Sequence, residues 1–185
     1  AAVPLVIEAD MIGADPARPD EVTVVVGQEA VALATGEIGD VRLTPSDPPA
    51  VPEALRAIHA ADYLVLGPGS WYSSVIPHVL VPELLEAIAT SRARRILALN
   101  LVPTDDETPA YTAARHIEVL AEHAPQLRFD VVVADPSFSR DDPHLSTFVE
   151  SLGAQLVVAP VRMRDGSPRH DPYLLAAVYA GIMGL

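Results

Sequence analysis

Short apolar runs separated by turn residues make up the first part of the chain. Strand-like clusters lie at residues 3–9, 22–26, 30–34 and 41–43. Gly and Pro residues lie between these clusters, and short β-branched runs bounded by Gly and Pro are typical of strands joined by tight turns. We therefore expect a small antiparallel β subdomain over residues 1–45. It ends at a Pro-rich connector, residues 45–52.

Beyond the connector, the pattern changes to an alternation of helix and strand. Helices are expected at residues 52–60, 81–91, 112–123, 143–152 and 171–183. Strands are expected at residues 63–66, 95–99, 130–134 and 155–159. Short apolar strands that alternate with helices of about ten residues imply a mostly parallel sheet covered on both faces. The sequence therefore predicts an α/β domain over residues 46–185.

The longest run without a formally charged residue, 63–82, has the length of a membrane span. It contains Gly67, Pro68, Gly69 and Pro77, which interrupt a helix at several points. We therefore expect a buried strand followed by a loop and no membrane insertion. The chain shows no signal peptide and does not begin with Met, which suggests a processed or partial chain.

The amino-acid composition excludes several classes of chemistry and of binding partner. The chain has no Cys and no Lys, which excludes disulfides, thiolate catalysis, cysteine-ligated metals, a P-loop lysine and lysine Schiff bases. Its net charge of −13 makes nucleic acid and anionic membranes poor partners. One phosphorylated metabolite remains a reasonable ligand, because a local site can oppose the global charge.

Ligands of open α/β sheets bind beyond the carboxyl ends of the strands, so the loops there are the candidate sites. After residue 66, two glycines allow close approach of backbone to a ligand, and hydroxyl groups follow that can donate to phosphate. The hydroxyls belong to Ser70, Ser73 and Ser74. A tight turn without a ligand is the alternative. No His pattern for a metal and no local sign of a Ser-His-Asp triad occurs.

Two further strand-end regions are candidates. Asn100 ends a strand, where its amide is placed to bind a base or sugar, and residues 105–107 (Asp-Asp-Glu) are either a metal site or a solvated loop. Arg162, Arg164 and Arg169 lie before the last helix. They form either an anion clamp or ordinary surface charge.

A longer pattern carries a family resemblance. Residues 67–84 read GPGSWYSSVIPHVLVPEL, and the sequence continues with Asn100-Leu101, Glu107-Thr108, Tyr111-Thr112, His116 and Arg169-His170. Together these resemble the YvcK-like gluconeogenesis factor family, relatives of the CofD 2-phospho-L-lactate transferases. The family's glycine before Glu-Thr is Asp106 here, and its Asp before His is Arg115. Its Gly-rich N-terminal segments are absent, so the resemblance implies a C-terminal portion that lacks the first βα units.

This resemblance implies a Rossmann-like fold and a cytoplasmic protein that binds UDP-sugars, UDP-N-acetylglucosamine in particular. Such a protein would act as a regulator, linking central carbon metabolism to cell-envelope precursor synthesis and cell shape. It would require no cofactor, and it would form a homodimer and signal to a protein partner. The implied ligand-binding residues are Gly67, Pro68, Gly69, Ser70, Ser73 and Ser74 around the diphosphate, Asn100 and Thr108 on the sugar or base, Phe148 stacked on uracil, and Arg169 on phosphate.

Two other functions stay open. The first is a CofD-like transferase that moves a 2-phospho-L-lactyl group to a deazaflavin with Mg²⁺. In the loop that corresponds to the one after residue 66, the transferases have a pattern that resembles Ser-Asn-Pro. Residues 67–70 instead match the pattern of the regulators. The second is a scaffold that contacts a partner protein and binds no ligand.

Overall fold

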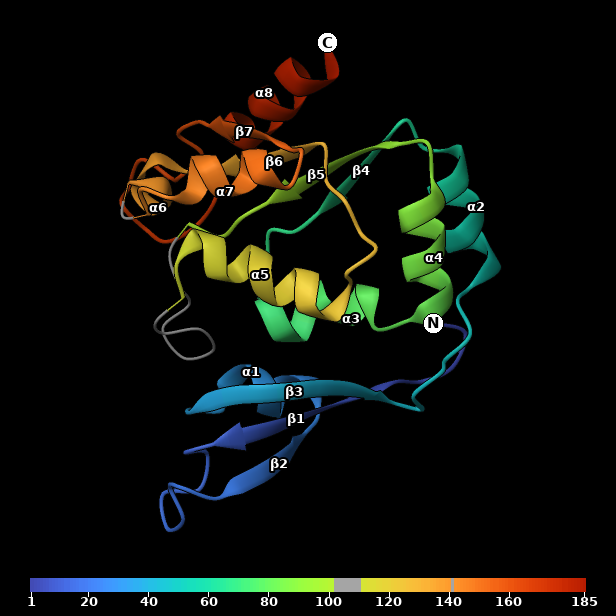
Figure 1. The fold of residues 1–185 in the computed structure, drawn as a ribbon, viewed down its shortest axis with the longest axis vertical. Coiled ribbons are helices and arrows are strands. Elements are labelled where there is room, and N and C mark those ends of the chain that lie inside the picture. The colour runs from blue at the N-terminus through green and yellow to red at the C-terminus, as the bar shows by residue number, and fades with distance from the viewer. Residues whose placement is uncertain (102–110, 141) are drawn as a thin grey trace.

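Residues 1–101, 111–140 and 142–185 are described by the computed structural model, and within them two β-sheets are flanked by helices (Figure 1). The first sheet confirms the antiparallel unit. It consists of β1 (Val6–Ile12), β2 (Val22–Val26) and β3 (Glu37–Thr44) in the order β2-β1-β3. Alternate residues of β1 are buried, as a strand with one face on the core requires. The proposed boundary at residue 45 lies just after β3 and stays a prediction.

The strand expected at residues 30–34 is wrong, because this segment is a helix, α1 (Gln28–Leu33). Gly27, with φ of +105°, turns the chain away from β2 and serves as the N-cap. The turn brings Val31 onto the core, where it is fully buried. The alternation of Ala and Val in this segment is a pattern typical of a strand, but alanine is the strongest helix former. The turn and the buried valine therefore favour a helix here.

The second sheet confirms the predicted α/β fold class with its parallel strands. Its strands are β4 (Tyr63–Leu66), β5 (Arg94–Ala98), β6 (Val131–Ala134) and β7 (Gln155–Val158), all parallel and in that order. The longer helices are α2 (Pro52–Ala60), α4 (Pro82–Thr90), α5 (Ala113–His123), α7 (Leu145–Ser151) and α8 (Pro172–Met183). A four-residue helix, α6 (Pro136–Ser139), follows β6. Crossovers between parallel strands are almost always right-handed, so this strand order places the connecting helices on one face of the sheet.

Helices cover both faces of the parallel sheet, as expected. One face packs with the connecting helices into the main hydrophobic core, which also includes the buried face of the antiparallel sheet. The other face meets α8, whose Val178, Tyr179 and Ile182 contact Ile96 and Val131. In Figure 1, α8 (red) accordingly lies on the opposite side of the sheet from α5. The two sheets thus share one core, and the antiparallel unit is fixed relative to the strand ends.

The loop expected after β4 is in part helical. A π-helix, η1 (Trp71–Val75), and a short helix, α3 (Ile76–Val79), replace it. Their apolar side chains Trp71, Tyr72, Val75 and Ile76 are almost completely buried. Pro77 lies in the first turn of α3, where no backbone N–H is needed. Burial of large side chains outweighs the unfavourable local sequence, and short π-helices occur frequently at functional sites.

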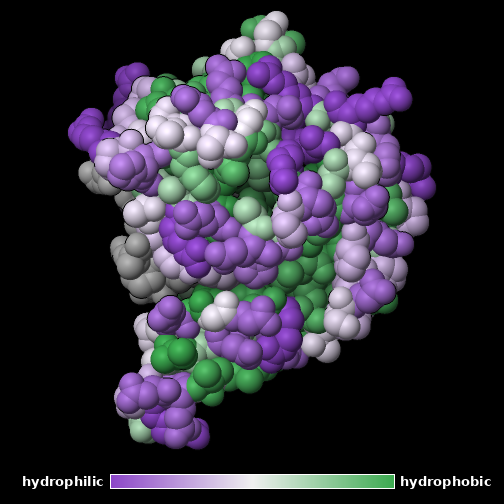
Figure 2. All heavy atoms as spheres, in the orientation of Figure 1, coloured by the Kyte–Doolittle hydropathy of each residue, from purple (hydrophilic) through white to green (hydrophobic). Residues whose placement is uncertain are grey.

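Two surface features complete the fold. None of the helices within the described residues is long and apolar enough to cross a membrane. On β2, Val22, Val24 and Val26 remain exposed by 63%, 50% and 55%. Figure 2 shows apolar side chains gathered over the antiparallel unit at the bottom of the view. Exposed valines at alternate positions mark the outer, solvent-facing side of this sheet.

Candidate functional site

The loop after β4 approaches β5 so closely that its first residue must be glycine. Gly67 has a φ of +76°, in the left-handed region, and precedes the cis-linked Pro68. A Cβ atom built on Gly67 would lie 2.5 Å from the backbone oxygen of Ala98 at the end of β5. The close approach predicted for this glycine is therefore to the protein's own backbone. It fixes the start of the loop against the neighbouring strand end.

Asn100 holds the next part of the loop. Its side-chain oxygen accepts a hydrogen bond from Gly69 N at 3.1 Å, and its amide nitrogen donates to Gly69 O at 2.9 Å. The residue is 6% exposed. The structure thus shows Asn100 as a support for the loop backbone, and the predicted contact with sugar or base stays a prediction.

Replacing Asn100 with alanine removes both of these hydrogen bonds. We expect the free energy of unfolding to fall by about 1–3 kcal/mol, the usual range for two buried hydrogen bonds. Urea unfolding of Asn100→Ala measures this loss. The control is Gln126→Ala, which removes an exposed amide and should leave stability unchanged. Equal stability of both variants would contradict a supporting role for Asn100.

The serine hydroxyls predicted to bind phosphate are partly engaged within the loop. Ser70 Oγ and Ser73 Oγ hydrogen-bond to each other, and Ser73 is buried. Ser70 also caps η1 by accepting from Ser73 N. From the antiparallel unit, Gln28 Nε2 donates to Ser73 O at 3.1 Å. These contacts order the loop. Ser74, in contrast, is half-buried and lines a cavity.

That cavity has a volume of about 350 Å³ and lies at the β4 edge of the sheet. Gly67, Pro68 and Ser74 line it, together with apolar residues of β4 and α4 and the side chain of His78. Arg95 also lines it, but its guanidinium already donates to three carbonyls at the end of α4. The cavity is therefore mainly apolar, with a hydroxyl and an imidazole as polar groups.

At the end of β6, a carboxylate that the sequence analysis missed joins two strand ends. Asp135 Oδ1 accepts from Ser137 N and Oγ at 2.9 and 2.6 Å, and Oδ2 accepts from Val161 N and Arg162 N at 2.9 and 3.2 Å. Burial raises the pKa of Asp135, but these hydrogen bonds outweigh burial and hold it below its ordinary value. The signal was available in the sequence, because Asp-Pro-Ser follows the apolar run directly.

The segment after β7 returns to the same edge of the sheet. Arg162 and His170 form an isolated antiparallel bridge, and the His170 ring lies near the backbone of Leu99. Burial lowers the pKa of His170, which keeps the ring neutral near pH 7. Ser137 Oγ donates to Leu101 O at 3.4 Å. Hydrogen bonds thus connect all four strand ends, from the loop after β4 to the segment after β7.

The other predicted ligand residues lie less centrally. Arg169 is 72% exposed in its side chain, and its guanidinium lies 3.6 Å from the Asp165 carboxylate. Phe148 is on α7, half-buried against the main core. Within the part of the chain that the structure describes, no hydrogen bond or ion pair joins either residue to the loop after β4. Thr108 and the acidic residues 105–107 lie outside the described residues.

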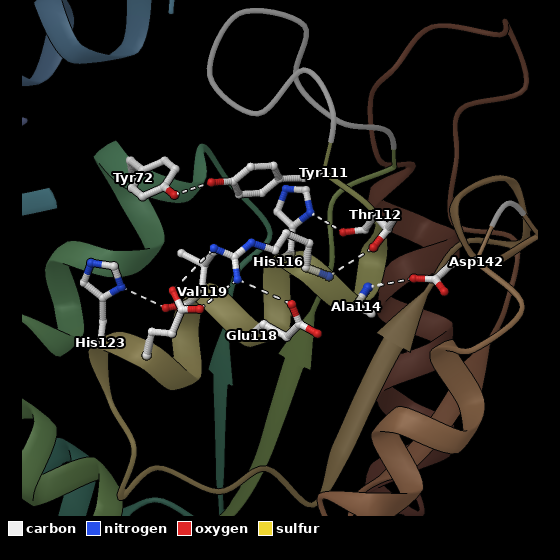
Figure 3. Close-up of polar contacts among 11 residues, drawn as sticks. Tyr72, Tyr111, Thr112, Ala114, His116, Glu118, Val119, His123 and Asp142 are labelled. Carbon is white, nitrogen blue, oxygen red and sulfur yellow. Dashed lines mark hydrogen bonds and ion pairs between the residues drawn. The ribbon is translucent and has the colours of Figure 1, made fainter. Parts of the chain in front are cut away.

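Several aromatic side chains cluster at the start of α5, beside the loop after β4 (Figure 3). His116 is fully buried, with Trp71, Tyr111 and Phe138 at ring-centroid distances of 4.9, 5.3 and 5.5 Å. Its Nδ1 donates to Thr112 O at 3.0 Å, and burial lowers its pKa. The histidine is therefore a neutral part of the core near pH 7.

Two polar contacts fix the same helix end. The hydroxyls of Tyr72 and Tyr111 lie 2.7 Å apart, which ties η1 to the start of α5, and Figure 3 shows the two hydroxyl groups pointing toward each other. The buried Asp142 accepts from Ala114 N at 2.9 Å. Arg115 pairs with Glu122 at 2.7 Å on the helix surface. The contact between the two tyrosine hydroxyls thus ties the loop after β4 to the start of α5.

Comparison with known proteins identifies the family. The family model described as 2-phospho-L-lactate transferase CofD matches residues 14–155, more than half of the chain. The chain belongs to the CofD family. Among CofD-family relatives, a putative gluconeogenesis factor of Mycobacterium tuberculosis is 46% identical over 184 residues, covering 97% of this chain and 53% of that protein. A putative gluconeogenesis factor of a Nostoc species is 37% identical over 168 residues, covering 82% and 37%.

Solved structures agree with this assignment to the CofD family. A crystal structure of a UPF0052-family protein from Bacillus halodurans superposes with a TM-score of 0.77 at 27% identity. It covers 97% of this chain and 58% of that one. The chain spans about half the length of the curated relatives that it matches. The resemblance to gluconeogenesis factors and to the CofD family, stated from the sequence, is therefore confirmed.

Proposed function

We propose that this chain binds a UDP-sugar, UDP-N-acetylglucosamine in particular, as part of a regulatory protein. The observation that carries the proposal is the hydrogen-bonded carboxyl edge of the parallel sheet, where the loop at Gly67–Ser70 is held by β5. Ligands of open α/β sheets bind at this edge. The similarity of this chain to putative gluconeogenesis factors supports a role in metabolic regulation. The nucleotide sugar itself follows from the resemblance stated above.

The site offers different chemistry to the two ends of such a ligand. The serine hydroxyls after β4, above all that of Ser74, favour a diphosphate, because hydroxyl groups can donate to phosphate oxygens. A cavity of about 350 Å³ beside Ser74 and His78 has the size of a small-ligand site and suits a ring system. Binding of both parts would couple the position of the ordered loop to the concentration of the nucleotide sugar.

The wider role is part of the same proposal. The protein links central carbon metabolism to the supply of cell-envelope precursors and to cell shape. It acts in the cytoplasm as a homodimer and passes the signal to a protein partner, without a resident cofactor. In this function, the ligand changes the surface that the partner recognises, and the chain itself performs no chemical step.

Calorimetric titration with UDP-N-acetylglucosamine tests the proposal, with GDP and a 5-deazaflavin as controls. We expect saturable binding of the UDP-sugar alone. Replacing Arg169 with alanine should weaken this binding about fivefold, the effect of losing roughly 1 kcal/mol from an exposed contact to phosphate. Arg92→Ala removes an exposed surface charge just before β5, at the opposite end of that strand from the site, and should have no effect. No binding of the UDP-sugar at millimolar concentration would contradict the proposal.

A second candidate, phospho-lactyl transfer to a deazaflavin, is favoured by the match to the CofD transferase family model. Its Mg²⁺ needs several oxygen ligands. Residues 1–101, 111–140 and 142–185 contain no group of three or more His, Asp or Glu side chains placed to hold a metal ion. The carboxylate of Asp135 already accepts four hydrogen bonds. The described residues do not fit the metal. Saturable deazaflavin binding, without UDP-sugar binding, would nevertheless favour this candidate.

A further inference from the structure

The strand β2 forms one edge of the antiparallel sheet and lacks the features that usually protect such an edge. The strand order is β2-β1-β3, so no described strand pairs with its outer side. Its sequence, Val-Thr-Val-Val-Val, contains no charged residue, no Pro and no Gly. Native proteins usually protect an exposed strand edge with charges, prolines or bulges, because an open edge pairs with other chains. The opposite edge, β3, follows this rule, since it contains Glu37, Asp40 and Arg42. The outer edge of β2 is therefore a candidate interaction surface.

The backbone groups that face outward from this edge belong to the residues with exposed side chains. Gly27 N donates to Ile7 O at 2.8 Å, in register with the rest of the β1–β2 ladder. Hydrogen-bonded and non-hydrogen-bonded pairs alternate in an antiparallel ladder, so every second residue of β2 points its N–H and C=O groups away from β1. These residues are Val22, Val24 and Val26, whose side chains are also exposed. The same valines thus offer both backbone hydrogen bonds and apolar surface.

An antiparallel second copy of β2 fits this edge in register. With a two-fold axis at Val24, each Val24 faces the partner's Val24, and Val22 faces the partner's Val26. Each of these facing pairs is then of the type that exchanges both backbone hydrogen bonds. The same pairs bring valine against valine on the outer face of one continuous sheet, and cross-strand side-chain contacts stabilise a sheet. The edge of β2 is therefore complementary to itself.

The charges around β2 allow this pairing although the chain carries a net charge of −13. Glu21, the charged residue next to the strand, faces the partner's Gly27 in this register, so like charges do not lie opposite each other. Arg18 also pairs with Glu21 at 3.1 Å. Both carboxylates on the outer face of β1 pair with Arg42 of β3. A parallel copy would instead place the two Glu21 carboxylates side by side, so the charges favour the antiparallel arrangement.

We propose that β2 pairs with β2 of a second copy of this chain, antiparallel and centred on Val24, which joins two antiparallel sheets into one. This interface would serve the homodimer of the proposed function, but it does not depend on the nucleotide sugar. In Figure 1, β2 lies at the bottom of the antiparallel unit, away from the parallel sheet, where a second copy can approach it. The chain turns into α1 at Gly27, which limits the pairing to the five residues of β2. Because so short an interface is small, we expect a dimer that dissociates on dilution.

Sedimentation equilibrium of the unmodified chain and of two charge variants tests this interface. We expect the unmodified chain to change from monomer to dimer as its concentration rises through the micromolar range. Val24→Glu and Val24→Arg each place like charges opposite each other across the axis, so the dissociation constant of the dimer should rise about 10- to 100-fold. An equimolar mixture of the two variants should regain the dimer, because opposite charges then face each other. A chain that stays monomeric at every concentration, or that assembles beyond a dimer, overturns the proposal.

The matched control is Val6→Arg. Val6 is 40% exposed on the outer face of the same sheet, but it lies on the central strand β1. This variant should form dimers like the unmodified chain. If the control lost the dimer to the same extent as the Val24 variants, or if their mixture stayed monomeric, β2 would not face its own copy and the proposal would be wrong.

Amide hydrogen exchange gives a second readout that needs no variant. The amides of Val22, Val24 and Val26 point outward, so their exchange should slow as the protein concentration rises into the range of the dimer. The amides of Thr23 and Val25 point toward β1 and should exchange slowly at every concentration. Exchange of the outward amides that does not depend on concentration overturns the proposal. A dimer with these properties in a chain that binds no UDP-sugar would leave the interface standing and contradict the nucleotide-sugar function.

Discussion

Gly67→Ala is expected to lower the free energy of unfolding by about 3–5 kcal/mol, one of the largest effects of a single methyl group in this chain. Two causes add together. The φ of +76° places an L-residue in the left-handed region, which costs about 1–2 kcal/mol. The new Cβ would also lie 2.5 Å from Ala98 O, a backbone atom at the end of β5 that cannot move without disturbing the sheet.

Gly153→Ala separates these two causes. Gly153 has a φ of +79°, close to that of Gly67, but its Cβ would meet no atom within 4 Å. We expect this control to lose only about 1 kcal/mol, the conformational part. Chemical denaturation of both variants gives the difference. If the two glycine variants lost the same stability, β5 would not constrain the loop, and the ordered strand-end site would lose its main support.

The parallel sheet was predictable because its signals are local. Residues 52–60 and 63–66 coincide with α2 and β4, since Pro52 marks the first helical turn and the short apolar run has the length of a buried strand. The segment after β4 was predicted less well. Its glycine and proline residues indicate a loop, but Trp71 and Tyr72 are buried in a core to which the distant antiparallel sheet also contributes. Contacts between distant segments decide the conformation there.

At the candidate site, too, the local sequence predicts the region, but contacts between distant segments decide what each side chain binds. Residue types at strand ends indicated this edge of the sheet as the candidate region, because every parallel strand ends there, and this stays a prediction. They did not indicate the hydrogen-bond partners of the side chains. Asn100 was expected to contact a ligand, and its amide binds the backbone of Gly69. Asp135 was overlooked, although its backbone partners lie 26 and 27 residues away and make it the link between β6 and β7. A strand-end amide or carboxylate takes whichever donor the fold brings near.

Asp135→Asn is expected to destabilise the protein by about 2–3 kcal/mol at neutral pH, as removal of buried charge-assisted hydrogen bonds does. An amide has one acceptor oxygen, so its NH₂ group would face either Ser137 N or the backbone N–H groups of Val161 and Arg162. Both arrangements place donor against donor. For a chain of this length, we expect the midpoint of thermal unfolding to fall by about 4–12 °C.

The matched control is Asp165→Asn. Asp165 makes the same local contacts, accepting from Ser167 N at 2.9 Å and Ser167 Oγ at 2.6 Å, but it is exposed and bonds to no distant backbone. We expect little change in the stability of this variant, because water replaces the lost contacts. The difference between the two variants therefore measures the link from β6 to the segment that carries Arg162 and His170.

The pH dependence of Asp135→Asn gives a further test of the same link. The folded protein holds the pKa of Asp135 below 3.8, so the unfolded chain binds a proton more readily than the folded one. The stability contributed by the carboxylate is therefore fully present above about pH 5 and is lost as the pH falls through the folded pKa. We expect the unfolding midpoints of the variant and the unmodified protein to differ most between about pH 5 and about pH 8. The two midpoints should converge at lower pH. A difference that stayed constant down to acidic pH would mean that the carboxylate charge does not hold the two strand ends together, and the site would then depend on packing alone.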